Sequence, residues 1–280
     1  MKKIGFIDYY ISEWHANNYP GWIRAANEML GTDYCVAYAW AEEEISPVDG
    51  VSTADWCSNM GVTQCETIAE LCEKSDVLLI LAPSNPEKHL QYAKEALRYG
   101  KRTYIDKTFA PDFETAKKIF AIAEEYHTPF FSTSALRCAD ELKEFAGAGN
   151  IIVTGGGSNF PEYLIHTAEM AEILLADPAK KVKVECMGEQ RICRVVTEKE
   201  SMAAIIFSPS MGFSVSAKKK DGEYVHRDIA SDFFQSLLAD ILRFYENGTA
   251  PFDTRETLEV MRLRSGLLKA EKTEGQWLEL

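Results

Sequence analysis

Short apolar runs without alternation recur along the first half of the chain. Residues 3–7 and 77–81 are two such runs, which are typical of strands buried on both faces of a parallel sheet. Residues 86–99 follow with apolar side chains on one helical face, and Gly100 provides a helix terminus that favours positive φ. A further apolar strand at 102–105 completes a strand–helix–strand unit. We expect its two strands to be parallel, with a right-handed crossover.

The same alternation extends over residues 1–133. Further strands are predicted at 33–40, 60–65 and 129–133, and further helices at 14–30, 67–75 and 111–126. Six strands alternating with helices indicate a doubly wound α/β sheet. We therefore expect a Rossmann-type dinucleotide-binding domain over residues 1–133.

The pattern changes after residue 133. Helices are predicted at 135–145, 161–175, 232–245 and 254–268, and strands at 182–187, 191–197, 202–208, 213–219, 223–229 and 276–280. Asp221-Gly222 is a hairpin turn signal between two of these strands. Consecutive strands joined by turns predict an α+β domain with an open antiparallel sheet over residues 134–280.

Composition narrows the range of partners. The 280 residues include 43 acidic and 30 basic side chains, without a basic stripe, so we expect neither nucleic acid nor an anionic membrane as a partner. We find no secretory signal or membrane-length apolar run and expect a cytoplasmic protein. The seven cysteines include no Cys-x-x-Cys pair, which favours reduced thiols over a metal site.

Several short motifs follow one another around the strand at 77–81. They are Asp76-Val77, Ala82-Pro83, His89, Ala96-Leu97, Gly100-Lys101 and Asp106-Lys107-Thr108. Their order and intervals resemble the nicotinamide-dependent oxidoreductase family of glucose-fructose oxidoreductase, inositol dehydrogenase and the rhizopine-catabolism protein. The family signature is Glu-Lys-Pro, so Lys107 matches it while Asp106 and Thr108 differ. The resemblance extends more loosely over nearly the whole chain.

The resemblance implies an NAD or NADP molecule at the carboxyl ends of the parallel strands, where such sheets bind ligands. The residues that it places near the cofactor are Tyr9, Tyr10, Ile11, Ser12, Ala82, Pro83, Ser84, Asn85, His89, Asp106 and Arg137.

The glycine fingerprint of a dinucleotide site is missing after the first strand. Asp8 stands at the first glycine position and Tyr10 at the second. A carboxylate there repels a pyrophosphate and a tyrosine fills its space, so we expect weak cofactor binding. The N-terminus of the helix at 14–30 still favours anions. His15, early in this helix, could correspond to a family histidine, but a structural role is favoured. The acids at 42–44 lie near the usual place of a ribose-binding acid, but a solvated loop is favoured.

The family's catalytic set implies Lys107, His166 and Glu162 as the groups that move a proton. Alcohol oxidation needs a hydride acceptor, which the cofactor provides, and a base. Lys107 follows a central strand, where a desolvated amine can exchange protons, and His166 titrates near neutrality. Glu162 lies one helical turn before His166 and can orient its imidazole.

Two functions of different classes are compatible with the sequence. The first is an oxidoreductase acting on a sugar, polyol or related hydroxy compound, assembled as a homodimer or homotetramer through the C-terminal sheet. The second is a non-catalytic ligand-binding or regulatory protein of the same fold that has lost the cofactor, which the loop at 8–13 favours. A lyase or glycosidase with an internal redox step is a third possibility that no residue selects.

Overall fold

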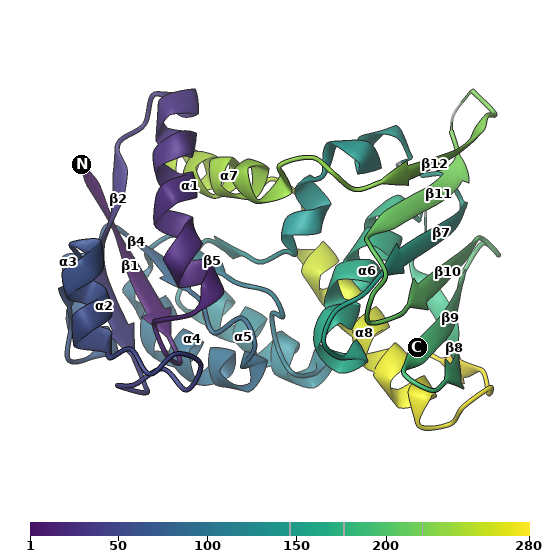
Figure 1. Cartoon of the computed structure of the whole chain (residues 1–280), viewed down its shortest axis with the longest axis horizontal. Helices are drawn as coiled ribbons and strands as arrows, with labels where there is room; N and C mark the ends of the chain where they lie inside the picture. Colours follow the sequence, from purple (N-terminus) through teal and green to yellow (C-terminus); the bar gives the residue numbers. More distant parts are fainter. Residues whose placement is uncertain (146, 176, 220) are drawn as a thin grey trace. The chain divides into compact units, whose positions relative to one another are not determined.

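The computed structural model describes residues 1–145, 147–175, 177–219 and 221–280 (Figure 1). They form two compact units, which are described separately. The first comprises Met1–Thr133 and Phe234–Thr254, and the second Ser134–Phe233 and Arg255–Leu280. The sequence-based division assigned all of residues 134–280 to the second domain, whereas in the structure Phe234–Thr254 form part of the first unit.

The first unit is built on a six-stranded sheet in the order β3-β2-β1-β4-β5-β6. Its strands are β1 (Lys2–Asp8), β2 (Tyr34–Ala41), β3 (Thr63–Gln64), β4 (Val77–Ile80), β5 (Thr103–Ile105) and β6 (Phe130–Phe131). Every pairing is parallel, which confirms the predicted Rossmann-like sheet. The strand order reverses between β1 and β4, and ligands of such sheets bind at this switch point.

Helices flank this sheet (Figure 1). They are α1 (Trp14–Leu30), α2 (Thr53–Met60), α3 (Ile68–Lys74), α4 (His89–Ala96) and α5 (Phe113–Glu125), with 3₁₀ turns η1 (Pro86–Lys88) and η2 (Leu97–Tyr99) around α4. Helix α2 was not predicted, although the Ser52 side chain accepts a hydrogen bond from Asp55 N as an N-cap. Helix α3 packs closely on β1 because Gly5 has no side chain: a Cβ there would lie 2.4 Å from Ser75 Oγ.

Helix α7 (Phe233–Asn247) supplies the returning segment of the first unit. The Tyr245 hydroxyl donates a hydrogen bond to the Leu78 carbonyl at 2.6 Å. The Phe131 and Phe244 rings meet edge to face, with centroids 5.1 Å apart. One side of α7 therefore packs on the parallel sheet.

The second unit contains a seven-stranded sheet among its described residues, in the order β12-β11-β7-β10-β9-β8-β13. The strands are β7 (Asn150–Gly155), β8 (Ala179–Met187), β9 (Gln190–Thr197), β10 (Met202–Phe207), β11 (Ser214–Lys218), β12 (Tyr224–Asp228) and β13 (Leu278–Glu279).

This second sheet is mixed, so the prediction of an antiparallel sheet needs a correction. Strand β7, which was not predicted, lies between β10 and β11 and pairs parallel with β10. Its flanking glycines were interpreted as turns, and the β-branched run between them, residues 151–154, was overlooked as a strand signal. Ile151 and Val153 point into the core, and this one-sided burial stabilises β7 at the centre of the sheet.

Helices α6 (Phe160–Leu174) and α8 (Arg255–Glu271) lie on one side of the second sheet (Figure 1). The helix predicted at 135–145 is instead two 3₁₀ segments, η3 (Ala135–Cys138) and η4 (Asp140–Glu144). Ala139 between them is extended, with φ −67° and ψ 132°, and its side chain is fully buried. A regular helix cannot pass through this backbone conformation.

Candidate functional site

Asp8 ties together the two strand ends at the switch point of the first sheet. Its Oδ1 accepts hydrogen bonds from Tyr9 N at 2.7 Å and from Ala82 N at 2.9 Å. Asp8 is 1% exposed, and its Oδ2 has no hydrogen-bond partner among the described residues. Burial, and next the charge of Glu13, raise the pKa of Asp8 well above its usual range. The Asp8 carboxyl group is thus held by backbone N–H groups, and its raised pKa favours the neutral form, which weakens the expected repulsion of a pyrophosphate.

Glu13 caps the first turn of α1 with its own carboxylate. Oε2 accepts a hydrogen bond from His15 N at 2.7 Å, and Oε1 accepts one from Ala16 N. The residue is 8% exposed, and burial raises the pKa of its carboxyl group although His15 and the backbone N–H groups oppose the shift. Glutamate is not among the favoured N-cap residues, so the sequence gave no signal for this role.

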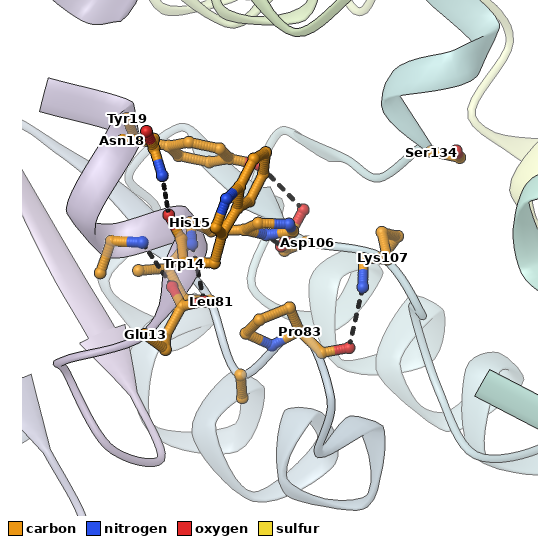
Figure 2. A network of polar contacts seen from close by, with 12 residues as sticks. Glu13, Trp14, His15, Asn18, Tyr19, Leu81, Pro83, Asp106, Lys107 and Ser134 are labelled. Carbon is orange, nitrogen blue, oxygen red and sulfur yellow. Dashed lines mark hydrogen bonds and ion pairs between the residues drawn. The ribbon is translucent and has the colours of Figure 1, made fainter. Parts of the chain in front are cut away.

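His15 and Asp106 form a buried pair at the end of β5 (Figure 2). His15 Nδ1 hydrogen-bonds Asp106 Oδ2, while the hydroxyls of Tyr19 and Tyr104 each lie 3.3 Å from Oδ1. Burial acts to raise the pKa of Asp106, but His15 and Lys107 outweigh it and the pKa falls below its usual range. The carboxylate therefore holds the imidazole in place, as a buried acid does for a histidine.

Lys107 follows Asp106 and is half-buried. Its Nζ lies 3.4 Å from the Pro83 carbonyl oxygen, which accepts a hydrogen bond (Figure 2). The described residues include no ion pair of Lys107, since Asp106 is held by His15. The amine retains donor capacity at the strand ends.

The other residues predicted to bind the cofactor differ in accessibility. Ile11 and Ser12 are buried, and Ser12 Oγ donates to Asp49 Oδ2 at 2.7 Å. Tyr9, Tyr10, Pro83 and Asn85 are half-buried, Ser84 is exposed and Ala82 is buried. The partly accessible residues could contact a ligand directly, whereas Ile11 and Ser12 are shielded from solvent and help to hold the loop in place.

His89 is fully buried between two backbone carbonyls. Nδ1 lies 3.0 Å from Phe109 O, and Nε2 lies 2.5 Å from Leu81 O. Burial lowers the pKa of the imidazole, and a neutral ring can donate to only one of the two oxygens. A direct contact with a cofactor would require this ring to leave its present position.

Glu42 begins the loop after β2, where an acid commonly binds the adenine-side ribose. It forms an ion pair with Lys88, and its Oε2 accepts a hydrogen bond from the Tyr92 hydroxyl at 2.7 Å. Although partial burial opposes the shift, these partners lower the pKa of the Glu42 carboxyl group. The solvated loop expected at 42–44 thus begins with an acid that is held in place.

His166 is half-buried on α6 in the second unit. Its Nδ1 lies 2.7 Å from Ser134 Oγ, and its ring contacts those of Tyr163 and Phe213. Ser134 was not predicted as a site residue. The available signal was a serine directly before a short helical segment, because its Oγ also accepts from Leu136 N as an N-cap.

Glu162 takes part in the N-terminal cap of α6. Its carboxylate accepts a hydrogen bond from Asn159 Nδ2 at 3.0 Å, while its N–H donates to Asn159 Oδ1 at 2.9 Å. This reciprocal arrangement resembles a capping box. The predicted action of Glu162 on His166 remains a prediction.

Arg137 links three elements of the second unit. Its Nε donates to Glu169 on α6 and its Nη1 to Glu256 on α8, each at 2.7 Å. Glu169 also accepts a hydrogen bond from Ser134 N at 2.6 Å, next to the histidine. These bonds give Arg137 a structural position, and its predicted contact with the cofactor remains a prediction.

The seven cysteines are free thiols. Among the described residues, His, Cys, Asp and Glu side chains form no group suited to a metal ion. No helix in the described ranges is both long and apolar enough to span a bilayer.

Comparison with known proteins links one part of the chain to a family. Residues 43–134 match the model of the Gfo/Idh/MocA family, described as an oxidoreductase family with an NAD-binding Rossmann fold. A curated relative, the uncharacterised oxidoreductase YhhX of Escherichia coli K12, is 36% identical over 55 residues, which are 20% of this chain and 16% of that protein.

Solved structures of similar fold match nearly the full chain. A probable dehydrogenase from Thermotoga maritima has a TM-score of 0.79 at 10% identity, with 99% of this chain and 98% of that chain covered. Scyllo-inositol dehydrogenase from Lactobacillus casei, solved with NAD(H) and scyllo-inositol, has a TM-score of 0.77 at 14% identity, with the same coverage. Myo-inositol dehydrogenase from Corynebacterium glutamicum has a TM-score of 0.74 at 13% identity, covering 100% and 98% of the two chains. These similarities establish the fold shared by the family.

Proposed function

We propose that this protein is a nicotinamide-dependent oxidoreductase acting on a sugar, polyol or related hydroxy compound. The observation that carries the proposal is the position of Lys107. Its amine lies just after the carboxyl end of β5, and Asp106 is held by His15 instead of forming an ion pair with Lys107. The inositol dehydrogenases of similar fold support the substrate class.

The strand ends of the first unit fit a nicotinamide dinucleotide except at one point. The backbone at 82–85, the partly accessible Tyr9 and Tyr10, and Lys107 could hold it at the edge of the sheet. At the first turn of α1, however, the N–H groups of His15 and Ala16 are already bonded to Glu13. When bound, the cofactor supplies the hydride acceptor or donor.

Side chains of the protein would then transfer the proton of the substrate hydroxyl. Lys107 Nζ would exchange a proton with the substrate hydroxyl, as a positioned acid–base group. His166 would be the second such group, with Ser134 holding its ring through the hydrogen bond at Nδ1. Glu162, which is predicted to orient His166, could do so only in addition to its role in the cap.

We favour NAD over NADP because of Glu42. A carboxylate after the second strand can bind the two ribose hydroxyls but repels a 2′-phosphate. Lys88 offsets part of this charge, so the preference is expected to be moderate. Binding constants for NAD and NADP measured side by side test this choice.

We propose a homodimer or homotetramer formed through the second sheet. Its face carries a groove of about 630 Å³ whose lining includes Ile152, Met202, Tyr224 and Trp277. These four side chains are between 45% and 78% exposed. Light scattering on the wild type and on a Ile152→Glu/Met202→Glu variant tests the assembly, because two charges in the groove should produce monomers. The cytoplasmic location remains a prediction.

The non-catalytic alternative is supported by the Glu13 cap, which occupies N–H groups that a dinucleotide would use. Calorimetry with NAD(H) and NADP(H) separates the two functions. We expect dissociation constants in the micromolar range, which corresponds to a binding free energy of about 8 kcal/mol. No heat at millimolar nucleotide, together with no oxidation of a panel of polyols and sugars, would favour the non-catalytic protein.

A further inference from the structure

The first turn of α1 carries a built-in anion. The Glu13 carboxylate accepts hydrogen bonds from the N–H groups of His15 and Ala16, and only 8% of the residue is exposed. These are backbone donors that no helix can satisfy internally at its start. In this chain the two N–H groups donate to the Glu13 side chain, which carries a full negative charge when it is ionised.

Helix α1 begins where a dinucleotide would bind, so the contact of Glu13 with its first turn bears on cofactor binding. Helix α1 follows β1, which borders the point where the strand order of the sheet reverses. In doubly wound sheets the pyrophosphate of a dinucleotide lies on the N-terminus of the corresponding helix. A carboxylate and a pyrophosphate cannot share the same donors, and their charges repel each other.

We propose that Glu13 is an internal competitor of the cofactor pyrophosphate and sets the nucleotide affinity of this protein. The inference rests on the proposed function, since it concerns how the same nucleotide binds. Binding would exchange one anion for another at the N–H groups of His15 and Ala16, with Glu13 turning away. The competition acts on ligands with phosphates and leaves uncharged ligands of the same edge unaffected.

Asp106 also acts on the ionisation of Glu13. It is buried, and its charge opposes the ionised form of the Glu13 carboxyl group. His15 acts in the opposite direction and supports the ionised form.

Two substitutions separate the charge of Glu13 from its capping role. Glu13→Gln keeps the shape and removes the charge, whereas Glu13→Ser keeps a favoured N-cap with a shorter side chain. Asp112→Ser is the matched control, because Asp112 caps α5 through Thr115 N and its loss removes another capping carboxylate of the same unit. Calorimetry would measure NAD⁺ and nicotinamide riboside in its reduced, uncharged form, which lacks phosphate, on all four proteins.

We expect Glu13→Ser to bind NAD⁺ at least about tenfold more tightly than wild type, since charge-assisted hydrogen bonds become available. Glu13→Gln should show a smaller gain, and Asp112→Ser none. The affinity for nicotinamide riboside should stay unchanged. If Glu13→Ser does not fold, as judged by circular dichroism, the Glu13→Gln result decides.

The remaining outcomes distinguish this inference from the function on which it rests. Equal NAD⁺ affinity in wild type and both Glu13 variants would overturn the competition and leave the oxidoreductase proposal intact. Absence of binding to every protein at millimolar NAD⁺ would overturn both. A gain of equal size for nicotinamide riboside would also overturn the inference, because the pyrophosphate would then not be the competing group.

Discussion

The imidazole of His15 is hydrogen-bonded to the carboxylate of Asp106, a residue 91 positions away in the chain. His15 lies in α1, and Asp106 directly follows β5. Both side chains are almost completely buried within the first unit. The pair explains how a lysine can follow an aspartate without forming an ion pair with it. It also makes His15, which looked like an ordinary core residue, part of the support of the candidate site.

Loss of the Lys107 amine should remove most of the activity and leave the stability of the fold nearly unchanged. Lys107→Met keeps the aliphatic stem, so the melting temperature should hardly change. Turnover should fall by about a hundredfold or more, as for other positioned acid–base groups, while nucleotide affinity changes little. Steady-state kinetics and calorimetry check this, with the exposed Lys117→Met as control. Wild-type turnover in Lys107→Met would rule out the proposed role.

Removal of the Asp106 charge should destabilise the protein. Asp106→Asn removes the buried carboxylate that hydrogen-bonds His15 Nδ1, and we expect the free energy of unfolding to fall by about 3 kcal/mol at pH 7. The pKa of Asp106 is below its ordinary value, so its stabilisation is complete above about pH 4 and decreases at lower pH. Urea unfolding at pH 7 and pH 3.5 should therefore show a smaller difference at the lower pH. A difference that is the same at both pH values would contradict the ion pair.

Glu172 should make the protein less stable at alkaline pH. Burial, and next the charge of Glu259, raise the pKa of Glu172 to about 7. Its Oε2 is buried without a hydrogen-bond partner among the described residues. A raised carboxyl pKa means that the folded state binds the proton more tightly, so its destabilising effect appears as pH rises from about 4 through about 7.

Glu172→Gln should accordingly be more stable than wild type at pH 8, by on the order of 1–3 kcal/mol, and similar to it at pH 4.5. Thermal unfolding across this pH range provides the measurement. The exposed Glu125→Gln serves as control and should show no such dependence. A variant less stable than wild type at pH 8 would show that the carboxylate is satisfied.

Ser134 should act on catalysis through His166. Ser134→Ala removes the hydroxyl at Nδ1, so we expect kcat to fall by about tenfold with little change in KM, and the pH profile of kcat to shift. Ser134→Thr retains the hydroxyl and should restore most of the activity. Equal loss in the Ala and Thr variants would indicate a packing role instead.

The apolar pattern of the chain was sufficient to predict the parallel sheet of the first unit. Unbroken runs such as residues 77–81 can be buried on both faces only in such a sheet, and the register from His89 to Lys107 was readable along the chain. The β-branched run at 151–154 was an available signal for β7, but the position of this strand between β10 and β11 could not be predicted. That strand is stabilised by neighbours more than 45 residues away, through the pairing of residues such as Ile151 with Ala203.

The polar contacts of the candidate site depended on tertiary structure. The sequence placed Asp8, Glu13 and Asp106 near the strand ends, but which of them faces a ligand was decided by folding. The Asp8 carboxyl group accepts hydrogen bonds from the backbone N–H groups of Tyr9 and Ala82, and the Asp106 carboxylate hydrogen-bonds His15. Glu13 alone met the N–H groups of α1, because hydrogen-bond donors and acceptors select their partners by distance in space and not by position in the chain.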